Sequence, residues 1–202
     1  MVAERPTAEM ALDLRFTPED LQRLPEDQRF ELVNGRLVER NMSVLSSTVG
    51  SRLHGRLWSF VETRGLGEVY AADLGYQCFP DDSQRVRKPD VSFVSASRWS
   101  DSFLEQGYCP IPPDLAVEVV SKHDLHSDVQ VKVSEYLGAG VRLVWVIDPE
   151  ARCAHVYTAT GTCRRLEAGD SLDGGDVVPG FQCLLAELFP GIRSAPGAPE
   201  QT

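Results

Sequence analysis

The sequence lacks the features that would place it in a membrane or outside the cell. No apolar run approaches the roughly 20 residues that are needed to span a bilayer. The N-terminal stretch carries charges where a secretion signal needs an apolar segment. The five cysteines are scattered and include no C-x-x-C pair of the kind found in zinc knuckles and redox motifs. We therefore expect a cytoplasmic protein without membrane association, with reduced and mostly buried cysteines.

Positive charge is also scarce, with 20 basic against 30 acidic side chains and a net charge of -10. This balance argues against a protein that binds polyanions through a general coat of lysine and arginine, although a local basic cleft remains compatible with it. The length of 202 residues, 42% of them hydrophobic, fits one globular domain. We expect an N-terminal arm over 1–16, a single domain over 17–190 and a flexible tail over 191–202.

The first elements are predicted by capping and turn signals. A short helix is expected over 17–24, where a capping threonine precedes proline and two acidic residues. Asn34-Gly35 lies between two short apolar stretches and predicts a two-residue hairpin turn, which puts Glu31 on the first hairpin strand. Apolar residues that recur every four positions predict a long amphipathic helix over 46–64.

The rest of the chain alternates strand-like and helical patterns, which is typical of an α/β protein with a mixed central sheet. The expected strands cover 68–79, 90–94, 114–121 and 141–149, with a hairpin over 154–172 and a strand-to-helix segment over 179–189. A helix capped by Ser127 or Asp128 is expected between the third and fourth of these strands. The strand over 114–121 is rich in β-branched residues and should be central and buried on both faces.

Glu118 interrupts the apolar pattern of that buried strand, in the run L-A-V-E-V-V. Burying an unpaired carboxylate costs several kcal/mol, so it must meet an opposite charge, a metal ion or the open end of the sheet. The plain alternative is a side chain that reaches solvent past the strand end.

Asp90 opens the neighbouring short strand and follows Pro89, whose fixed φ suits a strand entrance. Alone it is weak evidence, because Pro-Asp is a common turn dipeptide. Together with Glu118 it would give two hard oxygen ligands on adjacent strands, a rigid support of the kind that Mg²⁺ requires while it keeps several waters.

Lys132 is the third candidate for this site. It lies on the helix that follows the Glu118 strand, where its stem can cover apolar surface while its ammonium reaches the carboxylates. The alternative is an ordinary surface lysine. Lys122 is a rival, but it lies in the connecting loop, where flexibility suits a fixed catalytic role less well.

The order of these motifs resembles the Uma2 family, endonucleases of the PD-(D/E)XK superfamily with a restriction-endonuclease-like core. The resemblance covers roughly 17–190 and rests on FELVNGRLVE, KPDVSFV, PDLAVEVVS, DVQVKVSEYLGAGVRLVWVIDP and PGFQCLLAELF. It implies that Asp90 and Glu118 are the acidic residues of the two half-motifs. It also implies that Lys132 supplies the lysine that is missing at Val120, and that Glu31 adds a metal ligand or holds a metal-bound water.

Two positions depart from the family pattern. The histidine usual near the start of the long helix is absent around 46–48, and His54 comes too late to replace it, so we interpret His54 as a packing residue. The loop after the second half-motif reads Ser121-Lys122 in place of Ser-Pro. Neither change touches the three core residues, but both leave room for altered substrate contacts.

The leading hypothesis is a Mg²⁺- or Mn²⁺-dependent phosphodiesterase acting on DNA. Asp90, Glu118 and the carbonyl of Val119 would hold the metal, Lys132 would orient the attacking water, and Glu31 would assist. A cationic rim is expected from residues before Asp90 and after Glu118, unless they form a solvated loop. These are Arg85, Arg87, Lys88, Lys122, His123 and His126.

Two other functions stay open from the sequence. One is a catalytically silent module that keeps the nuclease fold for nucleic-acid binding or assembly, which the acidic charge favours. The other is a metal-dependent hydrolase of a smaller phosphodiester. A symmetric homodimer is expected only because such dimers are the commonest oligomers.

Overall fold

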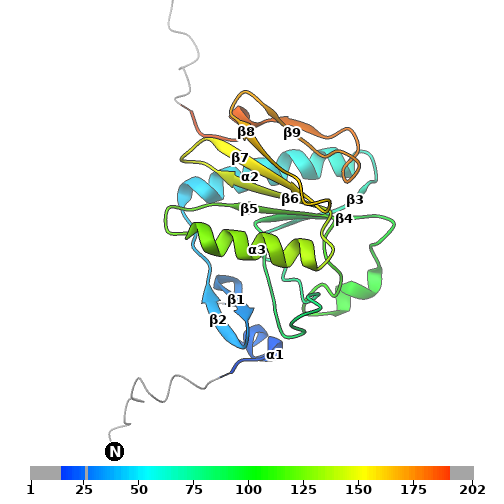
Figure 1. The fold of residues 1–202 in the computed structure, drawn as a ribbon. Coiled ribbons are helices and arrows are strands. Elements are labelled where there is room, and N and C mark those ends of the chain that lie inside the picture. The colour runs from blue at the N-terminus through cyan, green and yellow to red at the C-terminus, as the bar shows by residue number, and fades with distance from the viewer. Residues whose placement is uncertain (1–14, 26, 192–202) are drawn as a thin grey trace, which may run out of the picture.

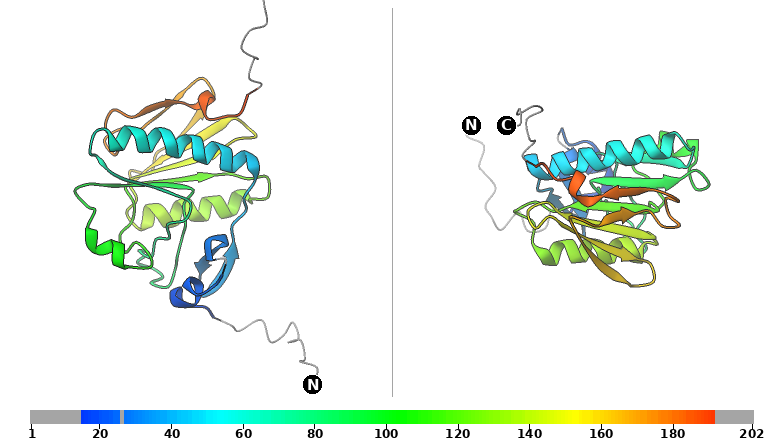
Figure 2. Two further views of the ribbon diagram at one scale, coloured as in Figure 1. Left: turned by 180° about the vertical axis from the view of Figure 1, so that it is seen from behind. Right: turned by 90° about the horizontal axis from the view of Figure 1, so that it is seen from above.

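The structure is a computed structural model that describes residues 15–25 and 27–191. Figure 1 shows a central sheet with helix α3 in front of it, and the views in Figure 2 place helix α2 on the opposite face. The α-helices are α1 (Pro18–Gln22), α2 (Val44–Glu62) and α3 (His126–Gly138), and the short 3₁₀ helices are η2 (Asp27–Arg29), η3 (Asp101–Glu105) and η4 (Leu185–Glu187).

Six strands form the central sheet in the order β3-β4-β5-β6-β7-β8. They are β3 (Gly67–Ala71), β4 (Val91–Ser95), β5 (Leu115–Val119), β6 (Leu143–Asp148), β7 (Cys153–Thr158) and β8 (Cys163–Glu167). Only β5 and β6 pair in parallel, and α3 makes the crossover between them. The other neighbours pair antiparallel, so the sheet is mixed. The predicted mixed sheet flanked by helices is confirmed.

Two small sheets lie outside this core. The N-terminal hairpin pairs β1 (Phe30–Val33) with β2 (Arg36–Glu39), and β9 (Ser171–Asp173) pairs with β10 (Gln182–Leu184). Asn34 and Gly35 take φ values of 51° and 73° at the hairpin turn, as the sequence predicts. Figure 1 shows that the hairpin lies beside α3, below the sheet in that view.

Helix α2 follows the predicted pattern and begins slightly earlier than expected. Ser43 caps it, in a reciprocal capping box with Ser46. The cap predicted for α3 is wrong, because that helix already begins at His126 and its N-cap residue, Leu125, makes no side-chain hydrogen bond. The loop is closed earlier, where Asp124 accepts the backbone N–H of Ser121 at 2.7 Å.

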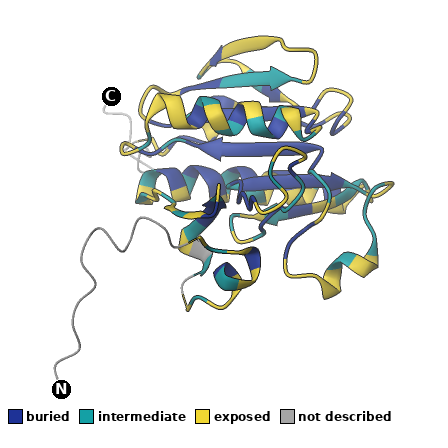
Figure 3. Cartoon of the chain, turned by 60° about the horizontal axis from the view of Figure 1, so that its bottom comes forward, coloured by how far each residue is buried: buried dark blue, intermediate teal, exposed yellow. Residues whose placement is uncertain are grey.

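The strand alternation of β5 divides the core between the two helices. Leu115, Val117 and Val119 face α2, whereas Ala116 packs with the apolar residues of α3. Figure 3 shows the resulting layers, with buried strands between helices whose outer faces are exposed. Glu118 shares the face of Ala116, so the alternation directs it at α3.

Other expectations are met in part. The strand expected over 68–79 continues only to Ala71, and the segment beyond it contributes isolated bridges at Tyr76. All five cysteines are unpaired, and Cys163 is exposed. The predicted arm and tail lie almost wholly outside the described residues. No helix in the described part of the chain is long and apolar enough to cross a membrane.

Candidate metal-dependent nuclease site

Two carboxylates meet where β4 and β5 lie side by side. The strands pair with Val91 opposite Val117, so one further step along this antiparallel register sets Asp90 opposite Glu118. Asp90 is fixed by its backbone, because its N–H donates to the carbonyl of Val117 at 2.8 Å. Its Oδ2 accepts the N–H of Val119 at 2.7 Å.

Helix α3 supplies the partners of Glu118 from two positions one turn apart. Lys132 donates from Nζ to Oε2 of Glu118 at 3.0 Å, and Tyr136 donates its hydroxyl to Oε1 at 2.6 Å. Both oxygens of this buried carboxylate therefore have a donor, which offsets the cost of burying it. The rival Lys122 is exposed in the loop and does not line the cavity at this site.

Glu31 reaches the same cluster from the hairpin and is only 1% exposed. Its Oε2 lies 3.2 Å from Nζ of Lys132 and 2.8 Å from Nη1 of Arg87. Its Oε1 accepts the backbone N–H of Lys88 at 2.9 Å. In this geometry the carboxylate of Glu31 holds Lys132 between itself and Glu118.

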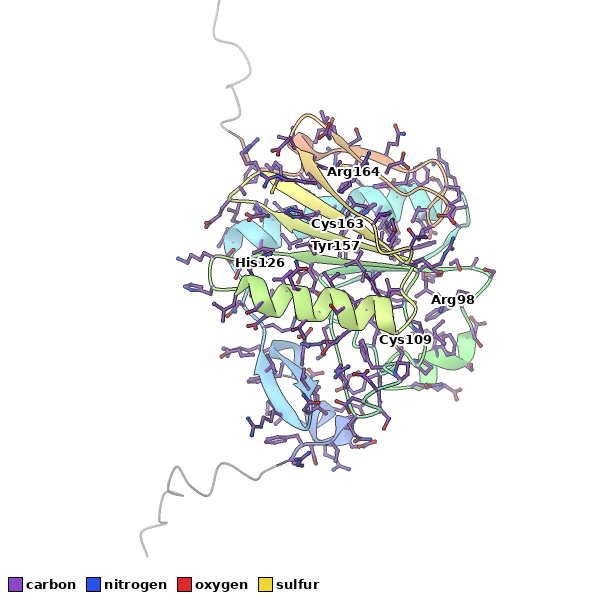
Figure 4. The ribbon with its side chains drawn as sticks, viewed as in Figure 1. Arg98, Cys109, His126, Tyr157, Cys163 and Arg164 are labelled. Carbon is purple, nitrogen blue, oxygen red and sulfur yellow. The ribbon has the colours of Figure 1, made fainter. Side chains whose placement is uncertain are left out.

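The basic residues before Asp90 do not form the expected cationic rim, nor a solvated loop. Arg87 is buried, bridging Glu31 to Glu135 of α3, and Arg85 lies 3.3 Å from the same Glu135. Lys88 is fully buried, donating to the carbonyl of Asp27 at 2.8 Å. The prediction failed because these cations pair with acids of the fold, namely Glu31, Glu135, Asp81 and Asp27, and are themselves buried. Lys122, His123 and His126 are exposed, and Figure 4 shows His126 at the start of α3.

Arg40 is a member of the site that sequence reasoning missed. It directly follows β2, and its side chain is 5% exposed. Its Nη2 donates to Oδ1 of Asp90 at 2.9 Å and its Nη1 to the carbonyl of Ala72 at 2.8 Å. An arginine one residue after a surface hairpin gives no sequence signal, because its contact with Asp90 depends on how the hairpin packs on the core.

Burial raises the pKa of two of the three acids in this cluster, Asp90 and Glu118. Burial raises the pKa of Glu118 most and Asp90 adds to the rise, while Lys132 opposes it, so that the pKa lies at about 7. Burial also raises the pKa of Asp90, although Arg40 opposes this rise.

Glu31 behaves in the opposite way. Burial would raise its pKa, but Lys132 and Arg87 outweigh burial and lower the pKa to about 2. Burial disfavours the ammonium of Lys132, but its two glutamate partners raise the pKa of this lysine, which is therefore protonated. The site thus holds a fixed ammonium beside one carboxylate that stays charged and another that titrates near neutrality.

These residues border one cavity of about 310 Å³, whose lining includes Glu31, Asp90, Glu118 and Lys132. The structure thus brings together the four side chains that the sequence singled out. At the cavity wall, Asn41 donates to Oδ1 of Asp124 at 3.0 Å, which links the segment after the hairpin to the loop after β5. His54 does not line this cavity but a second one of about 200 Å³, whose lining also includes Asp90 and Asn41.

The donor set fits a small divalent cation. Asp90, directly before β4, and Glu118 of the neighbouring β5 line one cavity, and burial raises the pKa of both acids, so that a further cation beside them would be stabilised. Among the described residues no group of three or more His, Cys, Asp or Glu side chains is arranged to hold a metal ion. A metal ion here would therefore be bound by two carboxylates and would take its other oxygen ligands from the backbone and from water. Mg²⁺ is typically bound in this way.

Comparison with known proteins places this arrangement in a family. A family model described as "Uma2: Putative restriction endonuclease" matches residues 18–187. A crystal structure from Anabaena variabilis, described as "a putative nuclease belonging to DUF820", has the same fold with a TM-score of 0.74. It is 20% identical, and the match covers 86% of this chain and 97% of that chain. No curated protein matches the chain. The extent of the family match shows that the chain belongs to the Uma2 family of restriction-endonuclease-like proteins.

Proposed function

We propose that the protein is an endonuclease that hydrolyses phosphodiester bonds of DNA with the help of Mg²⁺ or Mn²⁺. The observation that carries the proposal is the contact of protonated Lys132 with Glu118, opposite Asp90, at a cavity. A fixed ammonium beside two carboxylates is the charge pattern needed to hold a cation and an anionic phosphate together.

The two carboxylates have the role of cation ligands. Asp90 and Glu118 would hold the divalent ion, assisted by the carbonyl of Val119, whose N–H already donates to Asp90. When bound, such an ion supplies positive charge to the phosphate and acidifies water. Because Glu118 lies in β5 and Asp90, directly before β4, is hydrogen-bonded to β5, their positions are fixed before the ion binds.

Lys132 has the role of the positively charged side chain beside the reacting phosphate. Its ammonium can orient the attacking water and donate to a phosphate oxygen as negative charge develops there. Glu31 acts through Lys132 as a positioning residue, because three donors hold its carboxylate and the contact of 3.2 Å directs the lysine toward Glu118.

The test is cleavage of plasmid and single-stranded DNA by the purified protein with Mg²⁺ or Mn²⁺, compared with Asp90→Ala. We expect nicking by the wild type and none by the variant. Metal-dependent cleavage that is equal in the two proteins would point to a contaminant and overturn the assignment. Glu118→Gln, which keeps the size of the side chain, is also expected not to nick DNA.

A second candidate is a catalytically silent binding module that keeps this fold. The burial of Arg85, Arg87 and Lys88 favours it, because these cations are not available to a polyanion at the rim. The net charge of -10 acts in the same direction. Binding of Mn²⁺ at Asp90 without cleavage of any DNA substrate would select this candidate over the enzyme.

A further inference from the structure

The contact between Arg40 and Asp90 has a consequence for metal binding. The guanidinium donates at 2.9 Å to Oδ1 of Asp90, and the other oxygen of this carboxylate accepts the N–H of Val119 at 2.7 Å. Asp90 therefore already has a cation as its partner. A divalent ion that binds the same carboxylate must share it with this guanidinium or displace it.

Electrostatics makes sharing costly. A guanidinium and a divalent cation on one carboxylate repel each other across a few Å, and the side chain of Arg40 is only 5% exposed, which limits screening by water. Arginine cannot lose its charge at any ordinary pH. The repulsion can be relieved only by movement of the guanidinium or by an additional anion.

A substrate phosphodiester is such an anion. Arg40 and Asp90 line the same cavity as Lys132, so a phosphate beside the metal would lie within this group of cations. The guanidinium fork binds phosphate oxygens as readily as carboxylate oxygens. The second tether of Arg40, from Nη1 to the carbonyl of Ala72 at 2.8 Å, holds the guanidinium at the cavity while its partner changes.

We propose that Arg40 is an exchangeable counter-ion that couples metal binding to phosphodiester binding at the site. In the free protein the guanidinium of Arg40 is paired with the carboxylate of Asp90 and so weakens metal binding. When substrate binds, the guanidinium moves to the phosphate. This inference rests on the proposed function, since it assumes that Asp90 is a metal ligand. It adds that the free protein binds metal weakly and that metal and phosphate bind cooperatively.

The experiment measures free Mn²⁺ by electron paramagnetic resonance, with and without dimethyl phosphate, a phosphodiester that carries no base. In the wild type we expect dimethyl phosphate to tighten Mn²⁺ binding about tenfold, within the usual range of coupling between two sites. In Arg40→Gln, Mn²⁺ alone should bind about 10- to 100-fold tighter, because a charge-assisted hydrogen bond no longer competes. The effect of dimethyl phosphate should be several-fold smaller in this variant, because Lys132 and the bound Mn²⁺ still attract the phosphate but no guanidinium is exchanged.

Two further variants keep the test sharp. Arg40→Lys retains the charge but cannot span both Asp90 and Ala72 with a planar fork, so its Mn²⁺ affinity should lie between those of the wild type and Arg40→Gln. Arg29→Gln removes an exposed arginine of the same hairpin region, paired with Glu39, and should leave Mn²⁺ binding unchanged. Thermal melting in EDTA checks that each variant is folded. If Arg40→Gln is unfolded, tighter Mn²⁺ binding by Arg40→Lys than by the wild type supports the proposal, and equal binding by these two proteins overturns it.

The outcomes separate this inference from the proposed function. Equal Mn²⁺ affinity in the wild type and Arg40→Gln, with loss of binding in Asp90→Asn, overturns the role of Arg40 and leaves the metal site standing. An undiminished dimethyl phosphate effect in Arg40→Gln also overturns it. If the wild type and all variants, Asp90→Asn included, show no Mn²⁺ binding, both the inference and the metal-dependent function fall.

Discussion

Replacing Glu118 with glutamine should change how the stability of the metal-free protein depends on pH. The pKa of Glu118 is about 7 in the folded protein, against 4.5 for an ordinary glutamate. A carboxyl whose pKa is raised by folding binds its proton more tightly in the folded state. Its contribution to stability is therefore fully present below pH 4.5 and is lost as the pH rises towards 7, after which it stays constant.

The size of this effect follows from the same two values. A rise from 4.5 to about 7 corresponds to about 3 kcal/mol of stability lost between acidic and alkaline pH. Burial sets the direction, because Glu118 is 7% exposed and its charged form is poorly solvated. Glu31 has the opposite dependence, since its pKa of about 2 means that its stabilisation is lost as the pH falls from 4.5 towards 2.

The assay is urea unfolding in EDTA at pH 5 and pH 8, for the wild type and for Glu118→Gln. Glutamine mimics the protonated acid, so the difference between the two proteins should be small at pH 5. At pH 8 the variant should gain about 2 to 3 kcal/mol relative to the wild type. Titrating groups that do not contact Glu118 are common to both proteins and cancel, and Lys132, whose pKa is raised also by Glu31, stays protonated at both pH values. Parallel pH profiles for the two proteins would refute the reasoning, because they would mean that Glu118 titrates normally.

Three further predictions concern residues that pair with Glu118 or Glu31. Lys132→Met should lower DNA cleavage by about a hundredfold or more, as loss of one transition-state donor usually does, whereas Lys122→Met should leave the rate unchanged; equal rates for the two variants in a plasmid assay would contradict this. Tyr136→Phe should lower the unfolding free energy by about 2 kcal/mol at pH 8, where the hydroxyl donates to a charged carboxylate, and by less at pH 5, as urea titrations would show. Arg87→Met should cost about 3 to 5 kcal/mol, since it leaves buried Glu31 and partly buried Glu135 without their shared partner, and a loss under 1 kcal/mol in the same titration would exclude this role.

Local signals account for most of what the sequence predicts correctly. The Asn34-Gly35 turn requires positive φ at both positions, and the structure has it. Glu118 was recognised because a charge inside a buried strand needs compensation, and the structure provides Lys132. Both arguments work because they depend on a few consecutive residues and on a strong energetic penalty.

The failures concern contacts between segments far apart in the chain. The run Arg85, Arg87 and Lys88 looks like a basic surface cluster, but its distant partners come from η2, the hairpin and α3. Arg40 carries no pattern at all until the hairpin packs beside Asp90. Tyr136 fits the apolar periodicity of its helix and is buried, but its hydroxyl donates to the carboxylate of Glu118. Periodicity describes which face is buried and says nothing of a polar atom at the tip of a side chain.

The buried charges also show why the hairpin is part of the site. Lys132 contacts Glu118 of the sheet and Glu31 of the hairpin, and Arg87 joins that same Glu31 to Glu135. If the purpose of these contacts were only to attach the hairpin, well-packed apolar residues would serve equally well or better, because buried ion pairs rarely add net stability. What apolar packing cannot supply is a fixed ammonium next to a titrating carboxylate. The cost of burying these charges is therefore best explained by the chemistry of the site, and the hairpin is the element that keeps Lys132 in place.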